Sequence, residues 1–360
     1  MDVQRRNLKL IFKQLGQSIV FWTIAMILFG IFRYYGISEE EGISAGPEHD
    51  ESRIIPIFAL FGLFIGLVSA IIEFLLEKYL SKRVSIGSNL LVSTVIYFIS
   101  IIILATLTIE ISNTLYGLEI DNDRGWWVKD KTFWTVVVYM NFAALVLSFI
   151  QIANDKFGKG VFVKMLFGKY KEPKEEKRIF MFLDLKSSTT IAEELGHFKY
   201  SQLIQDCFYD LNEIVPDYDA EIYQYVGDEA VLSWPYHRGL SNNNCVRLFF
   251  AFRQKLLEKK DYYVEKYGTS PEFKAGLHGG VLMVAEVGVV KKEVAYHGDV
   301  INTSARIQAE CNTHKVPILI SERLLHDLEV GTFFSTRHLG DVLLKGKQKR
   351  VNIHTVMTNA

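Results

Sequence analysis

Cysteine is scarce in this sequence of 360 residues, and neither sign of charge is in excess. The wide, irregular spacing of the three cysteines excludes a zinc-ligand pattern and an even set of disulfides. Lysine and arginine number 40 against 41 aspartates and glutamates, so the charge indicates neither a nucleic-acid partner nor an acidic one. We therefore expect a protein of a reducing compartment that binds no nucleic acid. The cysteines are Cys207, Cys245 and Cys311.

Long apolar runs are absent from the second half of the chain and are concentrated in the first. A helix that crosses a bilayer needs about 20 apolar residues. Buried core helices are the alternative, but a soluble protein seldom carries four such runs with almost no internal charge. The sequence therefore predicts a membrane domain of four transmembrane helices in residues 1–153. The four runs are 17–35, 54–76, 89–109 and 133–152.

Basic residues alternate between the segments that join these runs. Lysine and arginine precede the first run, lie between the second and third, and follow the fourth, whereas acidic residues fill the other two loops. Because basic loops stay on the cytoplasmic side of a membrane, both chain ends are predicted to be cytoplasmic. We expect a multi-pass protein of the cell (inner) membrane.

The second half alternates strand-like and helix-like segments. Residues 154–177 are basic and interrupted by glycine and proline, and we interpret them as a coupling linker. Two β-rich runs flank Gly227-Asp228, a pair favoured in hairpin turns. The pattern predicts a ferredoxin-like α+β domain over 178–360 with helices on one face of its sheet. The predicted strands are 178–184, 220–226, 229–234, 273–285, 316–321 and two at the C-terminal end, and the later helices are 242–267 and 300–310.

Two carboxylates stand at strand ends of this domain. Asp184 closes the first strand, and Asp228 lies at the hairpin tip. Either one alone is more often a structural turn residue. As a pair on neighbouring strands, without histidine or cysteine, they fit Mg²⁺ that is shared between protein and nucleotide phosphates.

Two polar positions follow on the helix that begins after His297-Gly298-Asp299. Asn302 and Arg306 are four residues apart and therefore share one helix face. An arginine there fits a phosphate that gains negative charge, and an asparagine fits a ribose, although a solvated polar face has the same spacing. Near the C-terminal end, Lys345 and Lys347 flank a glycine, which suits a polyphosphate tail or an ordinary surface turn.

Together these segments resemble the catalytic domain of class III nucleotidyl (adenylyl/guanylyl) cyclases. The resemblance covers about residues 178–357, and no comparable match covers the membrane half. Five motifs carry it in order, which makes chance agreement improbable. They are Phe182-Leu183-Asp184-Leu185 with Ser187 to Thr189, Val226-Gly227-Asp228-Glu229, Gly276-Leu277-His278-Gly279-Gly280, Gly298 to Arg306, and Leu344-Lys345-Gly346-Lys347.

The resemblance implies a role for each matching residue. Asp184 and Asp228, with the backbone carbonyl of Leu185, would hold two Mg²⁺ or Mn²⁺ ions per site. Asn302 and Arg306 would stabilise the transition state from the second subunit of a homodimer. Lys345 or Lys347 would hold the terminal phosphates, as implied by the same family pattern.

Two positions depart from the family pattern. Gln224 stands where a base-reading lysine is common, and Ala295 stands where an aspartate or threonine often contacts adenine. The resemblance thus favours a membrane-bound adenylate cyclase that converts ATP to cyclic AMP and pyrophosphate. A guanylate or pyrimidine nucleotide cyclase and a non-catalytic nucleotide-binding receptor remain the alternatives, and a diguanylate cyclase is disfavoured because Asn302 and Arg306 have no place in its pattern.

Overall fold

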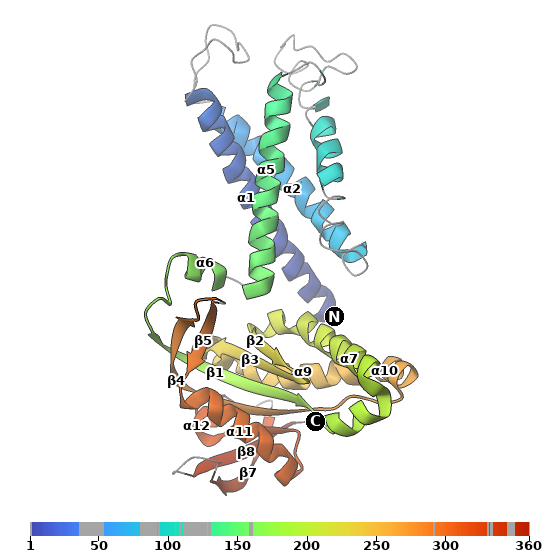
Figure 1. The fold of residues 1–360 in the computed structure, drawn as a ribbon, viewed down its shortest axis with the longest axis vertical. Coiled ribbons are helices and arrows are strands. Elements are labelled where there is room, and N and C mark those ends of the chain that lie inside the picture. Colours follow the sequence, from blue (N-terminus) through green and yellow to red (C-terminus); the bar gives the residue numbers. More distant parts are fainter. Residues whose placement is uncertain are drawn as a thin grey trace. The chain divides into compact units, whose positions relative to one another are not determined.

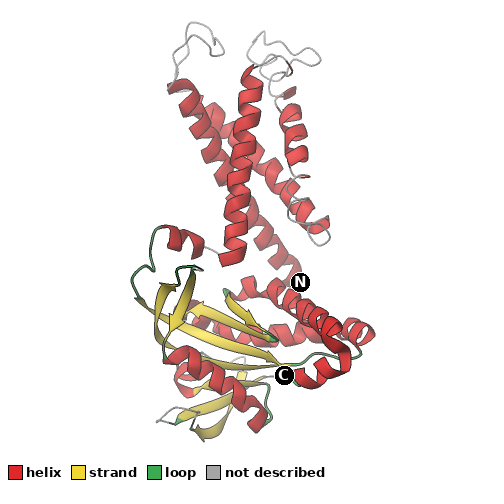
Figure 2. Ribbon diagram, in the orientation of Figure 1, coloured by secondary structure: helices red, strands yellow, loops and turns green. Residues whose placement is uncertain are grey.

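The computed structural model describes residues 2–35, 54–79, most of 92–110, 128, 131–157, 161–290, 292–329, 331, 334–343 and 350–359. The chain divides into two compact units, Met1–Ile152 and Ala153–Ala360. Each unit has its own hydrophobic core. The helices of the first unit and the mixed sheet of the second are drawn in Figure 2.

The first unit is helical throughout its described part. Its long helices are α1 (Asp2–Tyr35), α2 (Ile54–Tyr79) and α5 (Lys131–Phe157), and a shorter apolar helix covers Thr94–Leu104. Two helices, with apolar windows Leu15–Phe32 and Phe133–Ile150, are long and apolar enough to cross a membrane. The apolar segments of the other two described helices, Phe58–Ile72 within α2 and Thr94–Leu104, are shorter, so the number of four spans stays a prediction.

Small residues bring α1 and α2 together. A Cβ added at Gly62 would lie 2.6 Å from the Thr23 Cα atom, and one at Gly66 would lie 2.5 Å from the Ile19 Cα atom. Distances this short are excluded for real side chains, so only glycine permits the observed approach of the two backbones. Gly62 and Gly66 of α2 therefore pack against α1 of the same chain.

The second unit is built on one mixed sheet (Figure 1). The strand order is β2-β3-β1-β4-β6-β8-β7, with β5 paired to β4, and within the described residues every pairing is antiparallel except that of β4 with β6. The strands are β1 (Lys174–Leu185), β2 (Glu221–Val226), β3 (Glu229–Pro235), β4 (Phe273–Val287), β5 (Glu293–His297), β6 (Ile318–Ser321), β7 (Phe334–Val342) and β8 (Val351–Thr358).

Helices precede β1 and fill the connections between the strands. They are α6 (Val161–Leu166), α7 (Ser188–Ile214), α8 (Tyr236–Leu240), α9 (Asn244–Glu258), α10 (Lys260–Tyr267), α11 (Asp299–His314) and α12 (Glu322–His326), with short 3-10 turns at Val215–Tyr218 and Ser241–Asn243. The hairpin around Gly227-Asp228 is confirmed. The helix expected over 242–267 is instead two helices separated at Lys259, and β5 and α12 were not predicted from the sequence.

Side-chain alternation along β1 divides the core into two layers. Ile179, Met181 and Leu183 pack on the face that carries α7 and α9, whereas Phe180 and Phe182 pack on the opposite face. Helix α11 contributes Val300 to that second layer and lies across β4 and β1. The expectation of helices on one face was therefore wrong, because the strands of this sheet are apolar on both sides.

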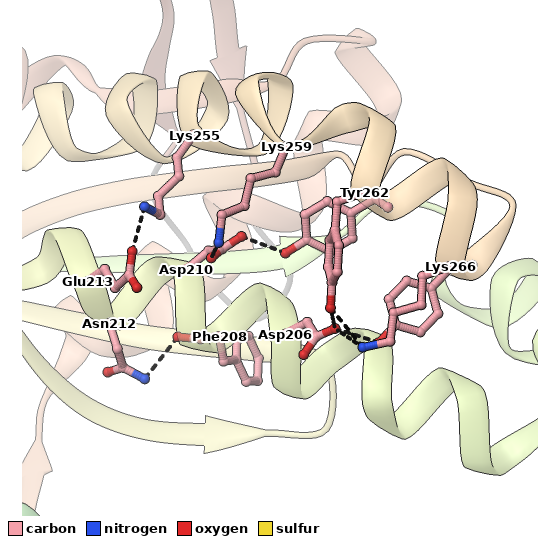
Figure 3. A network of polar contacts seen from close by, with 11 residues as sticks. Asp206, Phe208, Asp210, Asn212, Glu213, Lys255, Lys259, Tyr262 and Lys266 are labelled. Atoms are coloured by element: carbon pink, nitrogen blue, oxygen red, sulfur yellow. Dashed lines mark hydrogen bonds and ion pairs between the residues drawn. The ribbon is translucent and has the colours of Figure 1, made fainter. Parts of the chain in front are cut away.

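Polar contacts hold α7 against α9 and α10 (Figure 3). The buried Asp210 accepts from Lys259 Nζ and, at 2.7 Å, from Tyr263 Oη. Lys266 Nζ lies 2.8 Å from Asp206 Oδ2 at the exposed end of the same helix pair. These bonds fix the helices that cover the face of β1 carrying Ile179, Met181 and Leu183.

Candidate active site

Asp184 lies in β1 between two charged neighbours. The register places it opposite Glu229 of β3 and opposite Lys274 of β4, so the three side chains share one face of the sheet. Lys274 Nζ lies 3.0 Å from Asp184 Oδ2, and Gln308 of α11 donates to the same oxygen at 3.0 Å. One carboxylate oxygen is thus held by two donors.

The contact from Gln308 depends on a glycine in β4. A Cβ added at Gly276 would lie 2.2 Å from the backbone nitrogen of Gln308 and 2.5 Å from its Cα atom. A side chain at this position would push α11 off the sheet. The first glycine of the Gly276 to Gly280 motif is therefore what lets α11 reach Asp184.

Asp228 follows a glycine in the turn between β2 and β3. Gly227 has a φ of 63°, a value that glycine adopts without steric cost, at the first central position of a two-residue hairpin turn. Asp228 Oδ2 is buried and has no hydrogen-bond partner among the described residues. A buried carboxylate oxygen without a partner is costly, and a bound cation would satisfy it.

Three carboxylates repel one another at this strand end. Burial, followed by the charges of Asp184 and Asp228, raises the pKa of Glu229 to about 7. Burial also raises the pKa of Asp184, and the charge of Asp228 adds to this, although Lys274 and Gln308 oppose the shift. The site therefore concentrates negative charge that a cation would neutralise.

The donors present fit a hard divalent cation. Carboxylate oxygens are the ligands that Mg²⁺ and Mn²⁺ take, usually one or two from the protein with the rest from phosphates and water. Within the described residues no group of three or more histidines, cysteines, aspartates or glutamates is arranged to enclose a metal ion. Asp184 and Asp228 would supply two carboxylates to such a cation, and phosphate or water oxygens would supply the other ligands.

Asn302 and Arg306 lie on α11 but turn away from this pair. Asn302 is exposed and Arg306 half-buried, and neither makes a hydrogen bond or ion pair within the described part of the chain. Gln308 is two residues after Arg306, which at about 100° per residue places the two side chains on nearly opposite sides of the helix. Since Gln308 contacts Asp184, Arg306 points away from the carboxylates of its own chain.

The remaining predicted residues lie apart from the carboxylates. Gln224 is exposed on β2, and Ala295 is half-buried on β5 opposite Ala285. Their neighbours Tyr223 and Tyr296 approach with ring centroids 4.8 Å apart, which brings the β2 and β5 segments together. Leu185 is the last residue of β1, directly after Asp184. Lys345 and Lys347 lie outside the described residues.

Sequence reasoning missed three residues of this site: Glu229, Lys274 and Gln308. Glu229 directly follows Asp228 in the Val226 to Glu229 motif, so a second carboxylate beside Asp228 could have been recognised from the sequence. The other two are far from Asp184 in sequence and reach it only through strand register and helix packing. No local pattern marks them.

A cavity lies elsewhere on the second unit. It has a volume of about 580 Å³ and contains none of the predicted site residues. Lys177 in its wall lies over the Tyr236 ring at 3.7 Å and within 3.8 Å of Asp327. Its shape alone does not indicate chemistry, whereas the unsatisfied carboxylate oxygen of Asp228 does. We therefore assign the candidate active site to the carboxylates.

Similarity to known proteins identifies the family of the chain. Residues 170–358 match the family described as the adenylate and guanylate cyclase catalytic domain. The chain is 33% identical over 218 residues to adenylate cyclase 2 of Rhizobium meliloti (strain 1021). The aligned residues cover 61% of this chain and 60% of that protein. It is 24% identical over 195 residues to receptor-type guanylate cyclase gcy-7 of Caenorhabditis elegans, covering 52% of this chain and 17% of that protein.

The fold is also found among solved structures. A bacterial light-regulated adenylyl cyclase aligns with a TM-score of 0.52 at 16% identity, covering 63% of this chain and 66% of that chain. At this identity the likeness concerns the fold. The chain spans three fifths or less of the curated relatives named above.

Proposed function

The chain belongs to the class III adenylate and guanylate cyclase family, and from this premise we propose that it is a membrane-bound adenylate cyclase. It would convert ATP to 3′,5′-cyclic AMP and pyrophosphate at sites shared between two copies of the chain. We further propose the division into a membrane domain at 1–153, a coupling linker at 154–177 and a catalytic domain at 178–360.

The observation that carries the catalytic proposal is the pair Asp184 and Asp228, one of which keeps an unsatisfied buried oxygen. In the proposed reaction Asp184, Asp228 and the Leu185 carbonyl would hold two Mg²⁺ or Mn²⁺ ions. Bound there, the ions would supply Lewis acidity toward the ribose hydroxyl and the phosphates. The protein's own part is to fix these carboxylates, which Lys274 and Gln308 do for Asp184.

The orientation of α11 supports a site completed by a second copy. Asn302 and Arg306 lie on a helix face that turns away from their own carboxylates, so they are free to act on a nucleotide held by a partner. The arginine fork would bind phosphate oxygens as charge builds in the transition state, and the asparagine would orient the ribose. Lys345 or Lys347 would hold the terminal phosphates.

ATP is favoured as the substrate because the relative at 33% identity is named an adenylate cyclase. Gln224 offers both a donor and an acceptor and can pair with the N6 amino group and N1 of adenine, but a rotated amide can serve guanine. Ala295 adds no polar group, so discrimination between bases is expected to be modest, about ten- to a hundredfold. A guanylate or pyrimidine cyclase is the alternative within this enzyme class.

The membrane proposal rests on the surface of the first unit. Only 33% and 22% of the two long apolar windows are buried within the fold, so many apolar side chains point outward. Val138 and Phe142 on α5, for example, are exposed by 68% and 66%. Lipid would cover such a surface, and we propose a multi-pass protein of the inner membrane with both ends cytoplasmic.

Two experiments test these proposals on the purified full-length chain. In the first, ATP, GTP, CTP and UTP compete in the presence of Mg²⁺ or Mn²⁺. A product pool dominated by cyclic AMP supports the proposal. If another cyclic nucleotide dominates, the chain is a guanylate or pyrimidine nucleotide cyclase instead. If none of the four nucleotides gives a product, a non-catalytic nucleotide-binding receptor is favoured.

In the second, inactive Asp184→Asn and inactive Arg306→Ala chains are mixed. A site shared by two copies predicts that each heterodimer regains one complete site and part of the activity. Silence from a mixture that demonstrably forms heterodimers would show that each site is built within one chain.

A further inference from the structure

An exposed apolar and basic surface lies where the catalytic unit begins. Helix α6 and the residue after it expose Val163, Leu166 and Phe167 by 44%, 69% and 82%. Lys164 stands between Val163 and Leu166 and is half-buried, Lys171 follows Phe167 and is exposed, and no ion pair of either lysine occurs within the described residues. We call these five residues the α6 surface.

Tyr170, three residues after Phe167, attaches the segment with the α6 surface to the catalytic unit. The Tyr170 ring is buried against Phe180 and Phe182, its hydroxyl donates to Glu176 at 2.9 Å, and its carbonyl accepts from Glu286 N–H at 2.8 Å. The fold thus holds the segment at Tyr170 and leaves the side chains of Val163, Leu166 and Phe167 exposed. Adjacent exposed leucine and phenylalanine side chains indicate an interaction site.

The chain length limits what this surface can meet. The apolar window of α5 ends at Ile150, and α5 itself ends at Phe157, only three residues before α6 starts. Seven helical residues and a fully extended connection together span about 25 Å at most. If α5 crosses the bilayer, α6 stays within that distance of the cytoplasmic headgroups.

We propose that the α6 surface binds the anionic lipid of the cytoplasmic leaflet. Leu166 and Phe167 would enter the boundary between headgroups and acyl chains, and Lys164 and Lys171 would face the lipid phosphates. A short segment with bulky apolar residues beside lysines has the chemistry of an interfacial anchor. This inference rests on the membrane anchoring in the proposed function and adds a second attachment, which would set how the catalytic domain is held at the membrane.

The native cysteines make a selective test possible. Cys207, Cys245 and Cys311 are at most 2% exposed, and burial raises the pKa of each thiol to about 12. A thiol reagent will therefore react with an introduced surface cysteine in preference to these. Phe167→Cys places a nitroxide label on the α6 surface, and Phe198→Cys on α7, exposed by 76%, is the matched control.

The labelled full-length protein is placed in bilayers of phosphatidylcholine alone or of equal parts phosphatidylcholine and phosphatidylglycerol. Collision of the label with oxygen, which concentrates in lipid, is compared with collision with a water-soluble nickel chelate. The proposal predicts that the label at 167 collides preferentially with oxygen in the anionic bilayer, whereas the label at 198 collides with nickel in both. Replacing Lys164 and Lys171 by glutamine is expected to weaken the lipid association about twenty-five-fold, since each lysine near an anionic surface contributes about fivefold.

Other outcomes overturn the inference. Equal nickel accessibility at 167 and 198 in bilayer-embedded protein would refute lipid binding by α6 while leaving the membrane anchoring intact. Spin–spin broadening at 167 with low accessibility to both reagents would assign the surface to a second copy of the chain. Protein that does not enter the bilayer at all would refute the anchoring and this inference together.

Discussion

Lys274 holds the oxygen of Asp184 that a metal ion would need, so we expect it to weaken metal binding. Its Nζ atom lies 3.0 Å from Asp184 Oδ2 and 3.3 Å from Asn312 Oδ1, and the lysine side chain is 13% exposed. A hydrogen bond to a charged group contributes about 1.5–3 kcal/mol. A cation that takes this oxygen must displace the lysine, which keeps its contact with Asn312 and so recovers part of that loss.

Taking the lower end of that range, Lys274→Met is expected to bind Mn²⁺ about tenfold more tightly than the wild type. The metal-free variant is expected to lose about 1–3 kcal/mol of unfolding free energy, because Asp184 becomes a half-buried carboxylate without its cation. Binding is measured without nucleotide, from the resonance signal of free Mn²⁺ in titrations of the full-length protein. Unfolding is followed in parallel with and without Mn²⁺.

Lys186→Met is the matched control. Lys186 carries the same charge two residues beyond Asp184, but its partner is the exposed Glu272 at 3.0 Å. An exposed pair of this kind contributes little, so this variant should change neither Mn²⁺ affinity nor stability appreciably. If Lys274→Met binds Mn²⁺ as weakly as the wild type, or more weakly, the competition between lysine and metal is refuted.

Three further predictions follow from the same structure. Asp184→Asn and Asp228→Asn should keep the far-ultraviolet spectrum and lose nearly all metal-dependent cyclase activity, and a wild-type rate in either would refute the two-carboxylate assignment. Gly276→Ala should lower the unfolding free energy by about 3 kcal/mol or more, because its Cβ would overlap the α11 backbone. Gly227→Ala, in open space at positive φ, should lower it by only about 1 kcal/mol. Equal losses for the two variants in denaturant titrations would contradict the close approach of α11 to Gly276. Burial raises the pKa of Asp206, but three donors on α10 outweigh it and lower the pKa. The ionised Asp206 should therefore add about 1 kcal/mol to the unfolding free energy above the unfolded pKa near 4, and this contribution should vanish as the pH falls through the lowered folded pKa. A stability advantage of the wild type over Asp206→Asn that does not shrink with falling pH would contradict this.

The sequence alone determined the features that depend on short stretches of chain. Hydrophobic runs separated an apolar first half from a polar second half, and β-rich segments around Gly227-Asp228 predicted a hairpin that the structure contains. The two aspartates were found because a strand end and a turn are local features. The order of five motifs indicated the family, which the match over residues 170–358 shows.

Only the tertiary structure decided how distant segments meet. The register of β1 with β4 puts Lys274 beside Asp184, and the missing Cβ of Gly276 lets α11 bring Gln308 to the same oxygen. The same packing turns Arg306 away from its own carboxylates. Strand register and helix placement are fixed by how two apolar sheet faces are covered, which is a property of the whole core and has no periodic signature in any one segment.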